Sequence, residues 1–361
     1  MTRVETSEEF LAAIKSGAEI ELVGGREYIV DPRNPYQTAI RLDGIAGLEI
    51  YTDRTATHPA VIKLAPGDYT KSEPVVLFGM GRTDRAARLR FERLILDGND
   101  SQIVGESKQQ SALVRAFCCN DLVFDRVAFN DIAADGIKIA GHPDRGRAFG
   151  ISLRDCTSDQ TGRAAVVIQS LSEDVELIGL RTTNQRKAAI DIEATMSGHA
   201  GPRNIRLLDC ELEAVDEYGL QIGGDEIVEA FLSRVNVDGI LAHNAKVTIA
   251  DSDTRKLLVR KRSRVLAHLS ELGDVELTHH QSQCPSAQFR NCEIGELNAK
   301  SHAGLELTEC VVNRVKVCNE ARGVDVPGAI IRASMRRGGR PVEVSLDIRP
   351  WSKLGATRVW P

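Results

Sequence analysis

The sequence predicts an all-β fold in which short strands stack into parallel sheets as a solenoid. One observation is the composition: hydrophobic residues make up 42% and charged residues 27% of the 361 residues, which excludes a disordered or low-complexity chain. Aromatic residues make up only 4%, so the core is mainly aliphatic and β-branched, a composition that favours sheets. The other two observations are two short phrases that recur along the chain.

The first phrase consists of an apolar residue, two mostly polar residues and a small or apolar residue. It ends in Cys at 153–156, 207–210, 289–292 and 307–310, and in Leu, Val or Ser at 91–94, 124–127, 177–180, 232–235 and 249–252. Successive copies are 17 to 40 residues apart, and an irregular repeat of this kind is typical of a solenoid whose coils carry insertions. The step of 40 residues, between 249–252 and 289–292, predicts one further coil there.

The second phrase is a short strand with alternating apolar positions. It occurs at 136–139, 165–168, 189–192, 219–222 and 239–242, between copies of the first phrase, so one coil contains at least two strands. Stacked coils then form parallel sheets with ladders of inward side chains. We expect Cys156 and Cys210 to be rungs of such a ladder rather than metal ligands or redox groups, because a buried free Cys behaves as a small hydrophobe.

The two ends of the chain differ from the repeats. Residues 7–17 contain early acids, apolar spacing and a final Gly, which predicts a short N-terminal capping helix that hides the open edge of the first coil. The repeat is lost from about residue 323, where Arg, Gly and Pro are frequent. We therefore predict an N-terminal cap helix and first strand at 1–24, solenoid coils at 25–322 and a C-terminal cap at 323–361.

Charge and targeting signals restrict the partners. The net charge of −5 and the pI near 6.0 predict no attraction to nucleic acid or to an anionic membrane. No apolar signal segment follows the start and no run is long enough to cross a membrane. We expect a cytoplasmic location, or a secreted or virion location if an export signal has been removed, and the oligomeric state, a homo-oligomer included, is left open.

Three segments, at 7–22, 95–99 and 134–139, resemble the right-handed parallel β-helix proteins of the pectate-lyase-like superfamily. The resemblance covers roughly residues 7 to 320 and implies a single right-handed parallel β-helix. It is specific for the fold and poor for the reaction, because hydrolases, lyases, epimerases, phage tailspikes and non-catalytic modules share it.

Alternation along the second phrase predicts two outward columns of side chains, one residue per coil. The first column is Arg41, Val76, Arg115, Lys138, Val167, Asp191, Gln221 and Leu241. The second is Asp43, Phe78, Phe117, Ala140, Gln169, Glu193, Gly223 and His243. Coils ~4.8 Å apart and outward residues ~6.6 Å apart along a strand make these columns one compact, solvent-facing surface.

The middle of this surface contains the candidate catalytic groups. Asp191 and Glu193 are placed like the paired carboxyls of a glycosidase, or they bind Ca²⁺ through oxygen ligands with Gln169 or Gln221. Lys138 and Arg115 are placed to neutralise a uronate carboxylate or to remove the proton beside it. The alternative is that opposite charges on neighbouring coils are simple ladder pairs on a polar face.

The resemblance adds a pattern for this pair. Asp191-Ile192-Glu193 is similar to the carboxylate pair with which the chondroitinase-B and alginate-lyase branch binds Ca²⁺ beside a Lys base and an Arg. The branch has its Lys a few residues after the acids, and this chain does not, so Lys138 or His199 would act as the base. The only cofactor implied is Ca²⁺ on Asp191 and Glu193; no nucleotide or organic cofactor is indicated.

Two insertions and one basic run complete the candidates. The segments 141–147 and 197–203 follow equivalent strands and are expected to wall a groove, with His142 and Arg145 contacting substrate. The substrate-binding set also includes Gln169, Gln221, His243 and Phe117. The run 255–264 has six cations in ten residues, and we interpret it as a solvated face.

These observations predict a carbohydrate-active enzyme, a lyase or epimerase acting on a uronate-containing, anionic glycan. Lys138, Asp191, Glu193, His199 and Arg115 are the predicted catalytic residues. The scarcity of Trp and Tyr, on which neutral sugars stack, favours an anionic glycan or a small anionic ligand. The alternatives are a glycoside hydrolase using Asp191 and Glu193, and a non-catalytic binding or structural module similar to a phage tailspike.

Overall fold

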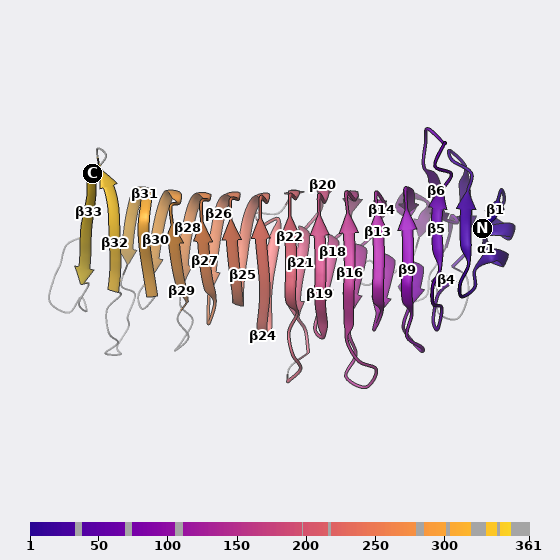
Figure 1. Cartoon of the computed structure of the whole chain (residues 1–361), viewed down its shortest axis with the longest axis horizontal. Coiled ribbons are helices and arrows are strands. Elements are labelled where there is room, and N and C mark those ends of the chain that lie inside the picture. The colour runs from indigo at the N-terminus through magenta and orange to yellow at the C-terminus, as the bar shows by residue number, and fades with distance from the viewer. Residues whose placement is uncertain are drawn as a thin grey trace.

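The computed structural model describes residues 1–32, 38–68, 74–104, 111–196, 198–215, 218–278, 285–300, 304–318, 330–337 and 340–347. In this part of the chain nearly all regular structure is β-strand, with α1 (Ser7–Ala13) and a 3-10 turn at Asp100–Gln102 as the exceptions. The strands lie side by side along one long axis, with the N-terminus and α1 at one end and β33 (Arg340–Asp347) at the other (Figure 1).

The strands form three parallel sheets, because each coil contributes to each sheet in turn. The first sheet contains β4 (Thr38–Arg41), β8 (Val76–Met80), β12 (Ala112–Phe117), β15 (Asp135–Ala140), β18 (Ala164–Gln169), β21 (Ala188–Ala194) and parts of β24 (Leu220–Ser233), β25 (Asn236–Ala250), β26 (Asp253–Arg260), β28 (Glu271–Thr278), β30 (Glu293–Lys300) and β31 (Gly304–Cys318). The second sheet contains β1 (Thr2–Val4), β2 (Glu19–Leu22), β5 (Glu49–Thr52), β9 (Ala87–Glu92), β13 (Asn120–Asp125), β16 (Ala148–Arg154), β19 (Ser172–Ile178), β22 (Arg203–Leu208), β27 (Arg264–His268), β29 (Ser286–Arg290), β32 (Ile330–Arg337) and other parts of β24, β25 and β31. The third contains β3 (Glu27–Val30), β6 (Ala60–Leu64), β10 (Leu94–Asp97), β14 (Ala128–Ile132), β17 (Thr157–Thr161), β20 (Arg181–Gln185), β23 (Glu211–Ala214) and the first residues of β25, β26, β28 and β30. A separate short pair joins β7 (Gly67–Asp68) to β11 (Ile103–Val104).

The first phrase of the sequence is the corner between the second and third sheets. At this corner one residue per coil has the left-handed conformation, with φ between 48° and 65°. These residues are Arg93, Arg126, Asp155, Gly179, Asp209, Arg234, Asp251, Leu269, Asn291 and Glu309. The predicted further coil between 252 and 289 is present as β27, with Leu269 at its corner.

The residue after each corner points into the core. Cys156, Cys210, Cys292 and Cys310 occupy this place, and all four are free and buried. Burial raises the pKa of Cys156 to about 12 and that of Cys210 to about 11, so both thiols stay protonated at neutral pH. The prediction that Cys156 and Cys210 are interior rungs is confirmed.

Four of the buried Phe side chains are gathered in one part of the core. Phe91 stacks on Phe124 with ring centroids 4.9 Å apart, and Phe78 and Phe129 make edge contacts with this pair. All four rings are fully buried in the early coils. The remaining core is mainly Ile, Val, Leu and Ala, with the Cys rungs and the separate aromatic residues Phe10, Tyr28 and Phe289.

Helix α1 lies against the first coil. The Thr6 hydroxyl accepts from the backbone N–H of Glu9, and the Glu9 carboxylate accepts from the N–H of Thr6, which is a capping box. Phe10 is buried edge-on against Tyr28, 5.8 Å between centroids. The helix ends at Ala13, earlier than the predicted 17.

At the other end, β32 continues the second sheet in parallel and β33 pairs with β32 antiparallel. These strands fall inside the predicted C-terminal cap at 323–361, and the rest of that range lies outside the described residues. No helix among the described residues is long and apolar enough to cross a membrane.

Candidate functional site

The strand pairing brings the predicted outward residues together on the first sheet. The first column runs through Gly79, Arg115, Lys138, Val167, Asp191, Gln221 and Leu241. The second pairs Phe117 with Ala140, Gln169 with Glu193, Glu193 with Gly223 and Gly223 with His243. The predicted register is confirmed from Arg115 to Leu241.

The columns are wrong at β8. Phe78 pairs with Val114 inside the core, and Gly79, not Val76, lies between Arg41 and Arg115. The reason is that Leu77 and Phe78 are both buried in the core as the chain enters the strand, so alternation counted from Val76 assigns the wrong faces. The predicted aromatic end of the surface therefore has Phe117 alone.

The surface is also less open than predicted. Lys138 is 6% exposed and Val167 is 0% exposed, although both point away from the core formed by Val166, Ile168 and Ile139. A charged group here sits in a poorly solvated place, which strengthens its interactions with neighbouring charges.

An ion pair that the sequence did not reveal lies near Lys138 and Asp191. Asp135 begins β15, and Arg163 directly precedes β18, whose Ala164 pairs with Asp135. Arg163 Nε and Nη2 each donate to one Asp135 carboxylate oxygen at 2.8 Å, and the Asp135 side chain is 0% exposed. In the sequence both residues occupy positions typical of turns. Only the stacking of two coils brings them together.

Lys138 and Asp191 are electrostatic neighbours of this pair. Burial lowers the pKa of Lys138, with Arg163 and Arg115 acting in the same direction and Asp135 and Glu193 opposing them. The pKa of Asp191 is raised to about 6, first by burial and then by the negative charge of Glu193. We call Asp135, Lys138, Arg163, Gln169, Asp191 and Glu193 the charged cluster.

Glu193 is positioned by the neighbouring coil. Gln169 Nε2 donates to Glu193 Oε1 at 2.5 Å, so this carboxylate is held on the side facing β18. Asp191 and Glu193 therefore differ in environment: Asp191 takes up a proton near pH 6, and Glu193 accepts a hydrogen bond from a neutral amide. Two carboxyls made unequal in this way are the usual requirement for an acid and a base in one site.

Ca²⁺ binding by Asp191 and Glu193 stays a prediction. Both are oxygen donors of the type that Ca²⁺ prefers, but the ion usually takes about six to eight oxygens. Among the residues that the structure describes, no group of three or more His, Cys, Asp and Glu side chains is arranged to hold a metal. Arg163 and Lys187 already provide positive charge beside Asp191.

Other predicted residues lie at different distances from the cluster. The Arg115 guanidinium lies over the Phe117 ring, 5.8 Å from its centroid, one coil before Lys138. Gln221 lies beside Asp191 on the next coil, and His243 pairs with Gly223 one coil further.

The two predicted loops extend from the same side of the solenoid, between β15 and β16 and between β21 and β22 (Figure 1). His142 Nδ1 accepts from the backbone N–H of Asp144, and the exposed Arg145 lies near Cys118. His199 lies in the second loop, where its backbone N–H donates to Met196. The roles of His142, Arg145 and His199 stay predictions.

Comparison with known proteins identifies the fold. No protein-family model and no curated protein sequence matches the chain. ORF18 of Geobacillus virus E2 is 10% identical over 85% of this chain, with a TM-score of 0.55, and this chain spans 57% of it. PfbA, a surface adhesin of Streptococcus pneumoniae, is 10% identical with a TM-score of 0.53, over 95% of this chain and 100% of that one.

The A-module of mannuronan C-5 epimerase AlgE6 of Azotobacter vinelandii is 12% identical, with a TM-score of 0.48, over 92% of this chain and 100% of that one. At these identities a likeness shows the fold alone. The chain is a right-handed parallel β-helix, as predicted.

Proposed function

We propose that the chain binds a uronate-containing glycan across the outward face of the first sheet and acts on it by elimination or epimerisation beside the carboxylate. The observation that supports this proposal most directly is the buried Lys138, whose pKa is lowered, two coils from Asp191, whose pKa is raised to about 6. A base and an acid with pKa values moved toward neutrality fit proton removal and proton return.

In the elimination, Lys138 in its neutral form takes the proton from the carbon next to the carboxylate. The electron pair of that C–H bond forms the carbon–carbon double bond, and the bond to the glycosidic oxygen breaks. Protonated Asp191 supplies the proton that the leaving oxygen needs. Arg115 and the Arg163 edge of the charged cluster stabilise the negative charge that develops on the sugar carboxylate.

In the epimerisation, the same proton leaves from one face of the sugar and a proton returns to the other face. Asp191 and Lys138 come from different coils, so a ring between them is approached by both groups. His199 remains the alternative base that the sequence indicates.

A glycoside hydrolase is the second candidate, and the different environments of Asp191 and Glu193 favour it. In that reaction protonated Asp191 would be the general acid, and Glu193, held by Gln169, would be the base or nucleophile. The two proposals differ in product: elimination gives an unsaturated uronate, and hydrolysis gives a new reducing end without one.

The test incubates the whole chain with alginate, pectate, a glycosaminoglycan and a neutral glycan, each with and without Ca²⁺. Ultraviolet absorbance follows unsaturated uronate, and a reducing-sugar assay follows hydrolysis. We expect an acidic glycan to be consumed by wild type and not by Asp191→Asn/Glu193→Gln. Arg290→Ala, at an exposed position on strand β29 of the second sheet, is the matched control and should act like wild type. Equal activity of wild type and the double variant would contradict the assignment of Asp191 and Glu193 to the active site.

A further inference from the structure

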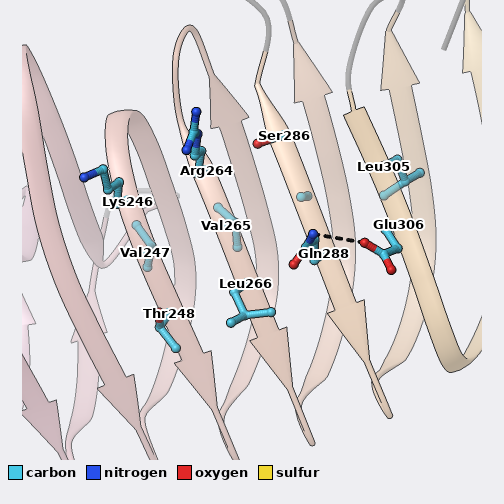
Figure 2. A pocket seen from close by; sticks show the side chains of 11 residues that line it. Lys246, Val247, Thr248, Arg264, Val265, Leu266, Ser286, Gln288, Leu305 and Glu306 are labelled. Carbon is cyan, nitrogen blue, oxygen red and sulfur yellow. Dashed lines mark hydrogen bonds between the residues drawn. The ribbon is translucent and has the colours of Figure 1, made fainter. Parts of the chain in front are cut away.

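A second concave surface lies on the outward face of the second sheet, away from the charged cluster. It is a hollow of about 720 Å³ over β25, β27, β29 and β31. Figure 2 shows the lining side chains on these four neighbouring strands. The polar lining residues are Lys246, Thr248, Arg264, Ser286, Gln288 and Glu306.

The middle row of this face contains both apolar and hydrogen-bonding side chains. The strand register aligns Phe231, Thr248, Leu266, Gln288 and Glu306 across five segments. Phe231 is 38% and Leu266 36% exposed, and the short Thr248 lies between them. A sugar ring has an apolar C–H face and a hydroxyl edge, so this row offers contacts of both kinds.

The two cations that line this hollow, Lys246 and Arg264, differ in whether they have an ion-pair partner. Lys246 Nζ lies 2.7 Å from Glu229 Oε1, and Gln288 Nε2 donates to Glu306 at 3.0 Å (Figure 2). The Arg264 guanidinium has no ion-pair or hydrogen-bond partner among the residues that the structure describes. Its planar fork is the group that binds carboxylate and sulfate oxygens in bidentate geometry.

Arg264 is also the last cation of the basic run 255–264, which the charged cluster does not use. Within that run Arg255 pairs with Asp238, and Lys256 lies over the Tyr218 ring at 5.4 Å. The chain then turns to the second sheet before Arg264. Arg255, Arg260, Arg262 and Arg264 of this run are exposed, as expected for a solvated face, and Arg264 is the member that lines the hollow.

We infer that this hollow is an accessory binding site for an acidic sugar unit of a glycan, separate from the charged cluster. Arg264 binds the carboxylate or sulfate, Leu266 contacts the apolar face of the ring, and Ser286, Gln288 and Thr248 bind hydroxyl groups. The inference takes its ligand class from the proposed function, but it requires no catalysis and uses none of the same residues.

The test is binding of a fluorescently labelled oligogalacturonate to the full chain, followed by anisotropy. Arg264→Ala should weaken binding about three- to tenfold, the value of one partly exposed charge-assisted contact. Arg290→Ala is the matched control, because Arg290 is exposed on the neighbouring strand β29 but does not line the hollow. Leu266→Ser should weaken binding while leaving the charge in place.

The outcomes separate the two sites. Loss of binding in Arg264→Ala with retention in Asp191→Asn/Glu193→Gln supports the accessory site whatever the catalytic result. Unchanged binding in Arg264→Ala, or no binding by wild type, overturns it. Equal binding of a neutral oligosaccharide or of polyglutamate overturns the assignment to an acidic sugar. If only Asp191→Asn/Glu193→Gln loses binding, the proposed function gains support and this inference fails.

Discussion

Asp135 illustrates how a buried charge in this fold depends on one partner. Its carboxylate is closed to solvent and receives two hydrogen bonds from Arg163 on the next coil. Burial raises the pKa of Asp135 in spite of this partner. The Arg163 guanidinium, with the nearby Lys138, therefore offsets only part of the cost of burying this carboxylate.

Replacing Arg163 alone should destabilise the protein strongly. Arg163→Met leaves the Asp135 charge uncompensated, and we expect the free energy of unfolding to fall by about 3 kcal/mol in urea denaturation. The double variant Asp135→Asn/Arg163→Met should be destabilised less than Arg163→Met alone, because no isolated charge remains. Arg181→Met removes an exposed pair with Glu211 and should cost at most about 1 kcal/mol. A double variant less stable than Arg163→Met would contradict this interpretation.

Asp191 predicts a pH dependence of stability. Its pKa rises from 3.8 to about 6 on folding, so between these values the folded state binds more protons than the unfolded state. The free energy of unfolding must then fall as the pH rises through this window. The Asn side chain cannot ionise. The free energy of unfolding of Asp191→Asn, relative to that of wild type, should therefore increase by on the order of 1–3 kcal/mol between pH 4 and pH 7.

Asp209 provides the opposite sign as a control. Arg234 donates to both of its carboxylate oxygens and lowers its pKa, so its stabilisation is present at neutral pH and lost as the pH falls. Asp209→Asn should therefore be less stable than wild type at neutral pH but not in acid. Thermal melts of the three proteins at several pH values measure both trends, and parallel curves for wild type and Asp191→Asn would contradict the assignment.

At the scale of elements, the corner between the second and third sheets is the most regular feature of the chain. It repeats a left-handed residue in every recognised phrase, and Asp, Asn or Gly occupies several of these positions. Asp, Asn and Gly tolerate this conformation best. The phrase was visible in the sequence because its apolar positions recur, while its conformation was not, since Arg, Glu and Leu also occupy the corner.

Leu269 is the least suited of these corner residues. It is 55% exposed and has φ of 50°, so its side chain gains little packing and its backbone is strained. Leu269→Gly should raise the free energy of unfolding by about 0.5–1 kcal/mol, measured by urea denaturation. Leu266→Gly, within strand β27, is the matched control and should destabilise by a similar amount. Destabilisation by both changes would mean that the corner is not strained.

At the scale of the molecule, the stacking of coils explains what the sequence predicted and what it did not. Period-two alternation and recurring phrases were sufficient for parallel sheets and for the register from Arg115 to Leu241. Alternation failed at Phe78, because two successive residues turn inward as the chain enters the strand.

The candidate site was predictable only in part for a related reason. Lys138, Asp191, Glu193 and Gln169 lie inside strands, where periodicity assigns a face. Asp135 and Arg163 lie where strands begin, and their contact depends on the exact pairing of two coils. Burial of Lys138 was likewise invisible, because strand alternation predicts direction and not solvent access.

The central claim is that Lys138 removes the proton from the carbon beside a uronate carboxylate and that Asp191 supplies a proton, either to the leaving oxygen or to the other face of that carbon. NMR of an oligouronate incubated with the protein in D₂O tests it most directly, since it detects both deuterium at that carbon and an unsaturated sugar. Wild type and Arg290→Ala should produce one of these signals, and Lys138→Met and Asp191→Asn should not. Neither signal from wild type with any acidic glycan, or equal signals from wild type and Lys138→Met, would contradict the account.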